Sequence, residues 1–404
     1  MTTLRFSSLR RFQFGLPQRI AAGFLLLFLA QGLWVTSRQT LSDLDYQYAR
    51  CGRETWERPA TVPGYYTTCG NIHDGILVYR LAGLPLTLNY LAERALDHLR
   101  KPEDRVVQTP GAEISTWELR HQMTHVLFFL RLPFLLAGCM LGAGLWWVTR
   151  RLYGNLGGYT ALGLYCFTPA VLRACIAPSA EVLAALGVYA GVYTCIGVAH
   201  AMQGPTARWR PRIVLLTAAL GVAAVSHIAA LPVAALLGFA LMLWVAQGRR
   251  SQILPVVLMA SIGAIVLLFV AYGFSPDAFS YVFRSASGFL WFSLQPAGRF
   301  FSTLSNAGIT LAAAAALIFY LALRRSRYFG NTAPLFCALV IFLLVMTGAP
   351  GSPWMWALPF LFTFIGGVFA DVYEGPRGRL ALYAAGALLF LQAVFCALSL
   401  SSLI

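Results

Sequence analysis

The chain has 404 residues, of which 58% are hydrophobic and only 11% are charged, a composition outside the range of soluble globular domains. Apolar runs of about 16 to 23 residues recur along it, close to the roughly 20 residues that cross a bilayer as a helix. The sequence therefore predicts an all-α polytopic membrane protein that forms a single transmembrane domain over residues 1–404.

We expect eleven membrane spans, with the N-terminus in the cytoplasm and the C-terminus outside. The segments that would face inward carry 16 basic residues and two acids, whereas the outer segments carry 14 basic residues and 13 acids. This asymmetry follows the positive-inside rule and accounts for the formal net charge of +15 without a nucleic-acid partner. The expected spans are approximately 20–36, 124–148, 156–173, 179–200, 212–229, 231–247, 252–272, 305–323, 333–348, 354–371 and 380–402.

Two long extracytoplasmic loops are expected, at residues 38–120 and 273–304. The first holds 11 of the chain's 15 carboxylates, which indicates a functional site beside the membrane surface. Ser42 can cap a short helix at its start, and residues 76–91 are predicted to form an amphipathic helix in the membrane interface. Cys51 and Cys69 are the two cysteines outside the spans. We predict that they form a disulfide, provided that the compartment is oxidising, and the alternative is two free thiols.

Four charged positions of this outer side can carry chemistry. The carboxylates of Asp43 and Asp45 can act as a general base or bind a metal, or they can simply stabilise a helix start. Arg131 is placed at the outer boundary by its distance from the inner arginines, where it can hold a phosphate or reach the lipid headgroups. Glu181 lies at the outer start of the fourth span and is either a second acid of the site or a favourable helix-dipole charge.

Two histidines of the outer side have either a chemical or a structural role. His73, followed by Asp74, can meet a phosphate or bind a metal, although such a pair is more often structural. His227 lies in the outer part of the fifth span and is predicted to be a buried core residue. Nucleotide-binding loops, zinc-ligand spacings, haem signatures and serine-hydrolase elbows are absent from the sequence, so a nucleotide-sugar or ATP site is not expected.

Residues 126–183 resemble the GT-C membrane glycosyltransferases, in particular the protein O-mannosyltransferase and aminoarabinose (lipid A) transferase branch. The resemblance is carried by Arg131-Leu-Pro133, the Arg150-Arg-Leu152 turn, Phe167-Thr-Pro-Ala170 and the acidic Glu181. Ser42-Asp-Leu-Asp-Tyr46 stands where the branch has an Asp-Glu pair, and His73 where it has a lysine or histidine before prolines.

The resemblance implies transfer of a sugar from a polyprenyl-phosphate donor to an acceptor at the extracytoplasmic face of a bacterial inner membrane. Asp43 or Asp45 would then remove the acceptor proton, Arg131 and His73 would meet the lipid phosphate, and Glu181 would be the second acid. The sequence requires no cofactor, although a divalent metal is compatible with it. The alternative is a non-catalytic GT-C-like scaffold or accessory subunit of a larger membrane complex. A transporter ranks last, because the charges collect at the outer face rather than at the midplane.

Overall fold

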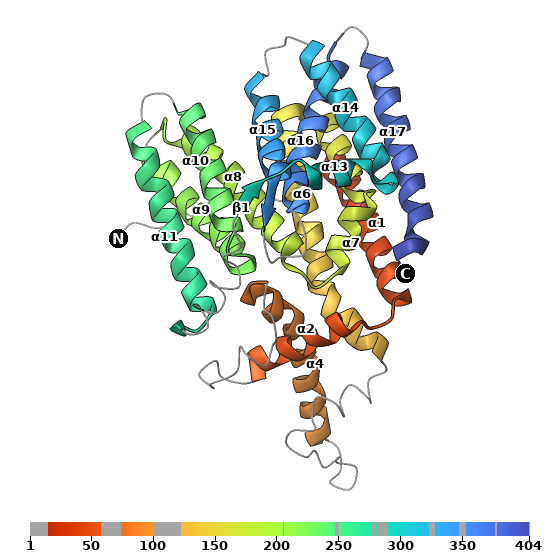
Figure 1. The fold of residues 1–404 in the computed structure, drawn as a ribbon, viewed down its shortest axis with the longest axis vertical. Coiled ribbons are helices and arrows are strands. Elements are labelled where there is room, and N and C mark those ends of the chain that lie inside the picture. The colour runs from red at the N-terminus through yellow and green to blue at the C-terminus, as the bar shows by residue number, and fades with distance from the viewer. Residues whose placement is uncertain are drawn as a thin grey trace, which may run out of the picture.

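The apolar runs of the sequence form helices that stand side by side in a bundle (Figure 1). The structure is a computed structural model that describes residues 15–57, 74–99, 123–204, 206–246, 250–276, 280, 290–322, 328–346, 353–375 and 378–403. Within these residues, eight helices are long and apolar enough to cross a membrane. The predicted class, an all-α polytopic membrane protein, is confirmed.

Each expected span overlaps at least one helix in the structure, although 156–173 is interrupted and 333–348 ends in a strand. The bundle consists of α1 (Leu16–Arg38), α6 (Met123–Cys166), α7 (Pro169–Ile176), α8 (Ala180–Ala201), α9 (Thr206–Ser226), α10 (Ala230–Val245), α11 (Ile253–Ala271), α14 (Ala307–Ala322), α15 (Tyr328–Leu343), α16 (Trp354–Tyr373) and α17 (Gly378–Ser399), with short 3-10 turns η2 (Arg250–Gln252) and η4 (Leu400–Leu403). The number of eleven spans stays a prediction, because α10 and α15 have only 16 residues each.

The second and third expected spans are the two halves of α6, which turns at Gly154. That residue has a φ of 82°, a left-handed conformation that glycine adopts at no steric cost. The third expected span, 156–173, is not continuous, since α6 ends at Cys166 and α7 begins at Pro169. The proline explains the break, because it disfavours helical geometry in Thr168 and has no N–H to donate. Short α7 and the turn after it lead to Glu181 at the start of α8.

One helix, α16, forms the centre of the bundle. Of the residues of α16 that could span a membrane, 94% are buried inside the protein, whereas only 17% of those of α17 are buried. Its apolar side chains belong to a continuous core that also includes residues of α1, α6, α8 and α15. The first turn of α16, at Trp354 and Trp356, therefore lies where several helices meet, and this turn borders both sites described below.

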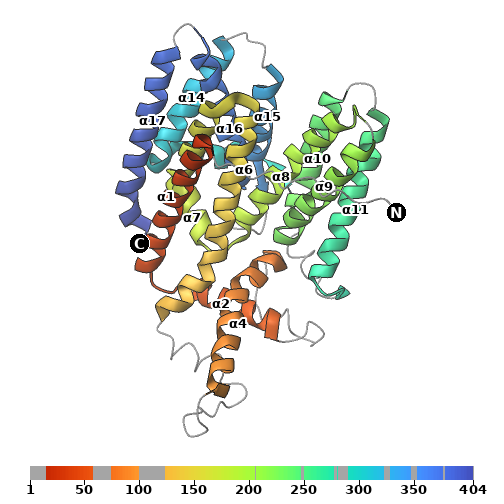
Figure 2. The same ribbon diagram turned by 180° about the vertical axis from the view of Figure 1, so that it is seen from behind.

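The two loop helices, α2 (Asp43–Glu57) and α4 (Ile76–Leu99), lie across one end of the bundle (Figures 1 and 2). The predicted helix at residues 76–91 is confirmed as helix, and its position in the membrane interface stays a prediction. The helix expected after Ser42 is also confirmed, and it extends to Glu57. Ser42 Oγ accepts from the Asp45 N–H at 3.1 Å, and Asp45 Oδ2 accepts from the Ser42 N–H at 3.2 Å. This reciprocal capping box determines where α2 begins.

The second loop is more structured than the sequence indicated. In its described part, β1 (Leu290–Phe292) pairs antiparallel with β2 (Leu344–Met346), and α13 (Gln295–Ser302) and η3 (Leu304–Asn306) follow. Strands of three residues give no periodic sequence signal, and β2 continues the apolar run of α15, so it was included in the span 333–348. Strand β1, which pairs with β2, lies directly before α13 in the chain. Helix α13 runs across the bundle at a level between the two ends of the bundle (Figure 1).

The crossing of α2 and α4 depends on two glycines. A Cβ on Gly83 would lie 2.0 Å from the Gly52 carbonyl carbon, and one on Gly52 would lie 2.5 Å from the Gly83 nitrogen. We expect Gly83→Ala to lower the Tm in detergent clearly, because overpacking typically costs about 1–3 kcal/mol and backbone atoms cannot rotate away. Gly144→Ala in α6 is the matched control, since its Cβ would have no neighbour within 4 Å. Equal Tm values for the two variants would contradict this packing.

Candidate functional site

A buried ion pair joins the start of α2 to α6. Arg131 Nη2 lies 2.6 Å from Asp45 Oδ2, and Arg131 Nε lies 3.3 Å from Asp45 Oδ1. Gln39 Oε1 accepts a further hydrogen bond from Arg131 Nη1, and Ser42 Oγ donates to Asp45 Oδ2 at 2.7 Å. A two-point arginine–carboxylate contact is both strong and directional. Asp45 and Arg131 therefore hold α2 in place, with both carboxylate oxygens already accepting hydrogen bonds.

The two aspartates that the sequence nominated as bases have different environments. Asp45 is 2% exposed and bound to Arg131, whereas Asp43 is exposed in the first turn of α2. The resemblance assigned the aspartates, Arg131 and Glu181 to one site. The structure instead brings Arg131 into direct contact with Asp45, and Glu181 belongs to a second group of polar side chains at the same end of the bundle.

This second group consists of Tyr48 in α2, Asp74 just before α4, and Glu181 in the first turn of α8. The Tyr48 hydroxyl donates a short hydrogen bond to Asp74 Oδ2. Burial, followed by the negative charge of Asp74, raises the pKa of Tyr48 above its ordinary value, so the hydroxyl remains a protonated donor. Glu181 is near enough for its charge to act on both Tyr48 and Asp74. We refer to Tyr48, Asp74 and Glu181 as the acid cluster.

The position of Asp74 follows from the contacts of the next residues. The Gly75 N–H donates to the Ser226 carbonyl at 2.7 Å, and the Ile76 N–H donates to the Tyr272 hydroxyl at 3.0 Å. A Cβ on Gly75 would lie 1.9 Å from the Val225 carbonyl oxygen, so only glycine fits against the end of α9. These contacts hold the start of α4, and with it Asp74, against the transmembrane bundle.

Two aromatic contacts border the acid cluster. The Tyr48 ring stacks on Tyr79 of α4, with centroids 5.2 Å apart and an interplanar angle of 27°. His227, which follows Ser226, packs edge-on against Trp356 of α16 at 5.6 Å. His227 is 7% exposed, and its Nδ1 accepts from the Ala229 N–H at 3.3 Å, as expected of a core histidine. The acid cluster thus lies among α2, α4, α8 and α9, with the start of α16 behind His227.

Two positions of the sequence prediction, His73 and Cys69, lie outside the described residues. Cys51 is 1% exposed in α2, and its bond to Cys69 stays a prediction. Within the described ranges, no group of three or more histidine, cysteine, aspartate or glutamate side chains could hold a metal ion. Asp74 and Glu181 could supply two carboxylate ligands, so a divalent metal also stays a prediction.

Asp74 and Tyr48 were not nominated from the sequence, although signals for both were present. In the sequence prediction Asp74 appeared only as the neighbour of His73, and the phosphate-binding or metal-binding role was assigned to the histidine. Tyr48 follows Asp45 by three residues, a spacing that places two side chains on one helix face. Once α2 is known to start after Ser42, this spacing turns Asp45 and Tyr48 inward together and leaves Asp43 outside.

No family model matches the chain, and no curated protein matches it by sequence. Solved structures do match. ArnT from Cupriavidus metallidurans in the apo state has a TM-score of 0.54 and 15% identity over 90% of this chain, and ArnT bound to undecaprenyl phosphate has 0.53 and 14% over the same share. The Archaeoglobus fulgidus oligosaccharyltransferase in complex with Zn and sulfate has a TM-score of 0.53 and 12% identity over 94%.

The chain spans 63% of the length of the ArnT structures and 53% of the oligosaccharyltransferase. Identities this low are evidence for the fold alone, and the fold agrees with the one that the motifs around Arg131 and Glu181 resemble. The protein is an integral membrane protein with the fold of the GT-C membrane glycosyltransferases.

Proposed function

We propose that the protein is a membrane glycosyltransferase that moves a sugar from a polyprenyl-phosphate donor to an acceptor at the extracytoplasmic face. The observation that carries this proposal is the acid cluster. Its two carboxylates come from separate chain segments, and at the end of the bundle expected outside Asp74 accepts the hydrogen bond of buried Tyr48 while the charge of Glu181 acts on the same tyrosine. The fold supports the class of enzyme, and the ArnT structure with undecaprenyl phosphate supports the class of donor.

In this reaction the acceptor oxygen attacks the anomeric carbon of the sugar while the bond from that carbon to the phosphate oxygen breaks. The acceptor proton passes to a carboxylate, and the polyprenyl phosphate leaves as an anion. Asp74 is our candidate for the base, because the Tyr48 hydroxyl bonds one of its oxygens and stabilises its ionised form. Glu181 is the candidate for holding the acceptor hydroxyl. Asp45 and Arg131 position α2, and exposed Asp43 is the alternative base.

The proposed setting is a bacterial inner membrane with the N-terminus in the cytoplasm, which the charge asymmetry of the loops supports. The partners are the polyprenyl-phosphate lipid, the acceptor and the surrounding lipids. His73, beside Asp74 in sequence, is retained as a candidate contact of the donor phosphate.

Purified protein in liposomes tests the function. The liposomes contain radiolabelled pentosyl and hexosyl decaprenyl phosphates together with a bacterial membrane extract that supplies acceptors. We expect the label to leave the donor fraction with the wild-type protein and to remain there with Glu181→Gln. If every donor remains intact although the wild-type protein is folded and correctly oriented, the transferase proposal fails. The non-catalytic scaffold, in which the same end of the bundle binds another subunit, would then account for the fold.

A further inference from the structure

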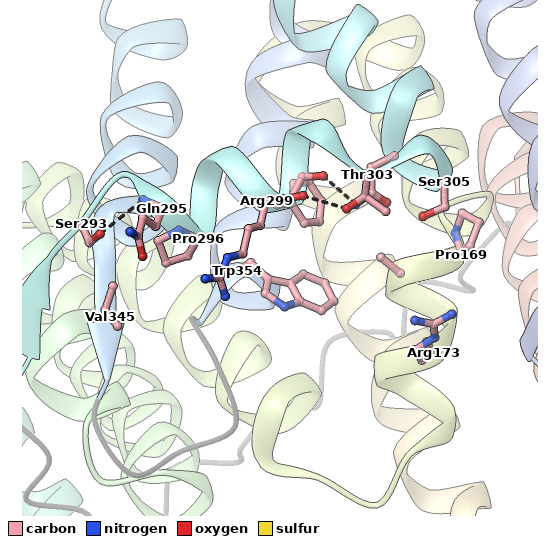
Figure 3. A pocket seen from close by; sticks show the side chains of 13 residues that line it. Pro169, Arg173, Ser293, Gln295, Pro296, Arg299, Thr303, Ser305, Val345 and Trp354 are labelled. Atoms are coloured by element: carbon pink, nitrogen blue, oxygen red, sulfur yellow. Dashed lines mark hydrogen bonds between the residues drawn. The ribbon is translucent and has the colours of Figure 1, made fainter.

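A pocket of about 500 Å³ lies between α7, α13, η3, β2 and the start of α16 (Figure 3). It is separate from the acid cluster and shares no lining residue with it. Its walls carry two arginines, Arg173 from α7 and Arg299 from α13, together with Gln295, Asn306, Phe300 and Trp354. Figure 3 shows the two arginine side chains on opposite sides of the Trp354 indole.

The two arginines are the first sign of an anionic ligand. Both side chains are exposed, and neither forms an ion pair with a described carboxylate. Helix α13 crosses the bundle between its ends (Figure 1), so Arg299 is not explained as a charge at the end of a span. An anionic ligand in the pocket would bring a negative charge to this pair of cations.

Asn306 supplies a second, independent sign. The residue is 4% exposed, and its Nδ2 donates to the Phe300 carbonyl at 3.0 Å. Its Oδ1 is buried and accepts no hydrogen bond from the described residues. A buried acceptor without a donor costs free energy of about 1–3 kcal/mol, which a hydroxyl group of a ligand would relieve.

The remaining walls are aromatic and apolar. Trp354 stacks on Phe300 with ring centroids 5.5 Å apart and an interplanar angle of 28°, and Pro169, Pro296 and Val345 complete the lining. A ligand that satisfies the whole pocket therefore combines a phosphate, a hydroxyl-bearing ring that can lie against an indole, and an apolar chain. Glycosylated lipid phosphates have this combination.

We propose that the pocket binds the phosphate-bearing headgroup of a lipid, with Arg173 and Arg299 supplying the positive charge of its walls and Asn306 a polar group at its edge. Identifying this lipid as the sugar donor rests on the proposed function. The placement suits that role, because Trp354 lines the pocket while Trp356, two residues later in the same turn of α16, packs on His227 beside the acid cluster.

Direct binding in nanodiscs tests the proposal without requiring transfer. The probe is radiolabelled decaprenyl phosphate, and the competitors are unlabelled decaprenyl phosphate, decaprenol, dioleoyl phosphatidic acid and inorganic phosphate. We expect Arg173→Gln and Arg299→Gln each to weaken probe binding at least about tenfold, since each removes charge-assisted hydrogen bonds. Arg173→Lys, which keeps the charge, should bind the probe more weakly than the wild type and more tightly than Arg173→Gln. Arg210→Gln, at an exposed arginine of α9 that does not line the pocket, is the matched control and should bind normally.

The competitors identify the source of the phosphate. Competition by decaprenyl phosphate but not by phosphatidic acid indicates the donor lipid, whereas equal competition by both indicates any lipid phosphate, and either result supports the site. Decaprenol competing as well as decaprenyl phosphate, or full binding by folded Arg173→Gln and Arg299→Gln proteins, would overturn it. Binding that depends on both arginines without any sugar transfer would refute the proposed function alone. If sugar transfer occurs but probe binding does not depend on the two arginines, the proposed binding site is refuted and the proposed function is not.

Discussion

Asp74→Asn is expected to lower the rate of sugar transfer by about 10²–10⁴, because a positioned general base typically contributes this factor. Asparagine has nearly the same shape and can still accept the hydrogen bond of Tyr48, so the protein should stay folded. Tyr48→Phe should have a smaller effect, about tenfold to a hundredfold, since it removes one hydrogen bond to a charged group. Initial rates of donor consumption measure these effects, and Tm values in detergent report on folding.

Asp43→Asn is the matched control for this series. It makes the same chemical change at an exposed position of the same loop, and it should leave transfer within about twofold of the wild type if Asp74 is the base. The opposite pattern, with transfer lost in Asp43→Asn and kept in Asp74→Asn, would return the catalytic role to the start of α2. If Asp74→Asn has a lower Tm than the wild type as well as less activity, Asp74 has a structural role instead.

Arg131→Gln is expected to destabilise the protein by about 3–5 kcal/mol, because it leaves Asp45 buried without its cation. The side chains of the pair are only 10% and 3% exposed. Arg50→Gln is the control, since it breaks the pair of Arg50 with Glu54, in which Arg50 is 52% exposed. A pair of this kind is worth at most about 1 kcal/mol. Unfolding by denaturant titration in detergent measures both changes.

A double-mutant cycle separates the Asp45–Arg131 contact from other effects of the two substitutions. Asp45→Asn and Arg131→Gln should each destabilise, and the double variant should lose less than the sum of the two, because neither partner is then left as an isolated charge. Additive losses would mean that the pair does not connect α2 to α6 in the membrane-embedded protein. Transfer by the variants should fall in proportion to the folded fraction, since we assign the pair to positioning rather than to chemistry.

Much of the fold could be predicted because a bilayer places strong demands on a chain. Backbone groups within lipid must be satisfied inside one segment, so a long apolar run becomes a helix whatever its neighbours are. The same reasoning places polar residues by depth, since distance along a helix from a basic loop measures distance across the membrane. Arg131, Glu181 and His227 all lie at the end of the bundle where α2 and α4 pack, although Arg131 belongs to α6, Glu181 to α8 and His227 to the turn between α9 and α10.

The sequence did not determine which of these side chains meet. Asp45 and Arg131 are 86 residues apart, and Tyr48 reaches Asp74 across a crossing that exists only because Gly52 and Gly83 lack side chains. The arginine pocket depends even more on tertiary structure. Arg173 follows a helix break at Pro169, and Arg299 lies in a short helix that follows a strand of three residues. Depth in the membrane is a property of one helix and can be read from its sequence. A contact needs the packing of several helices at once, and only the tertiary structure decides it.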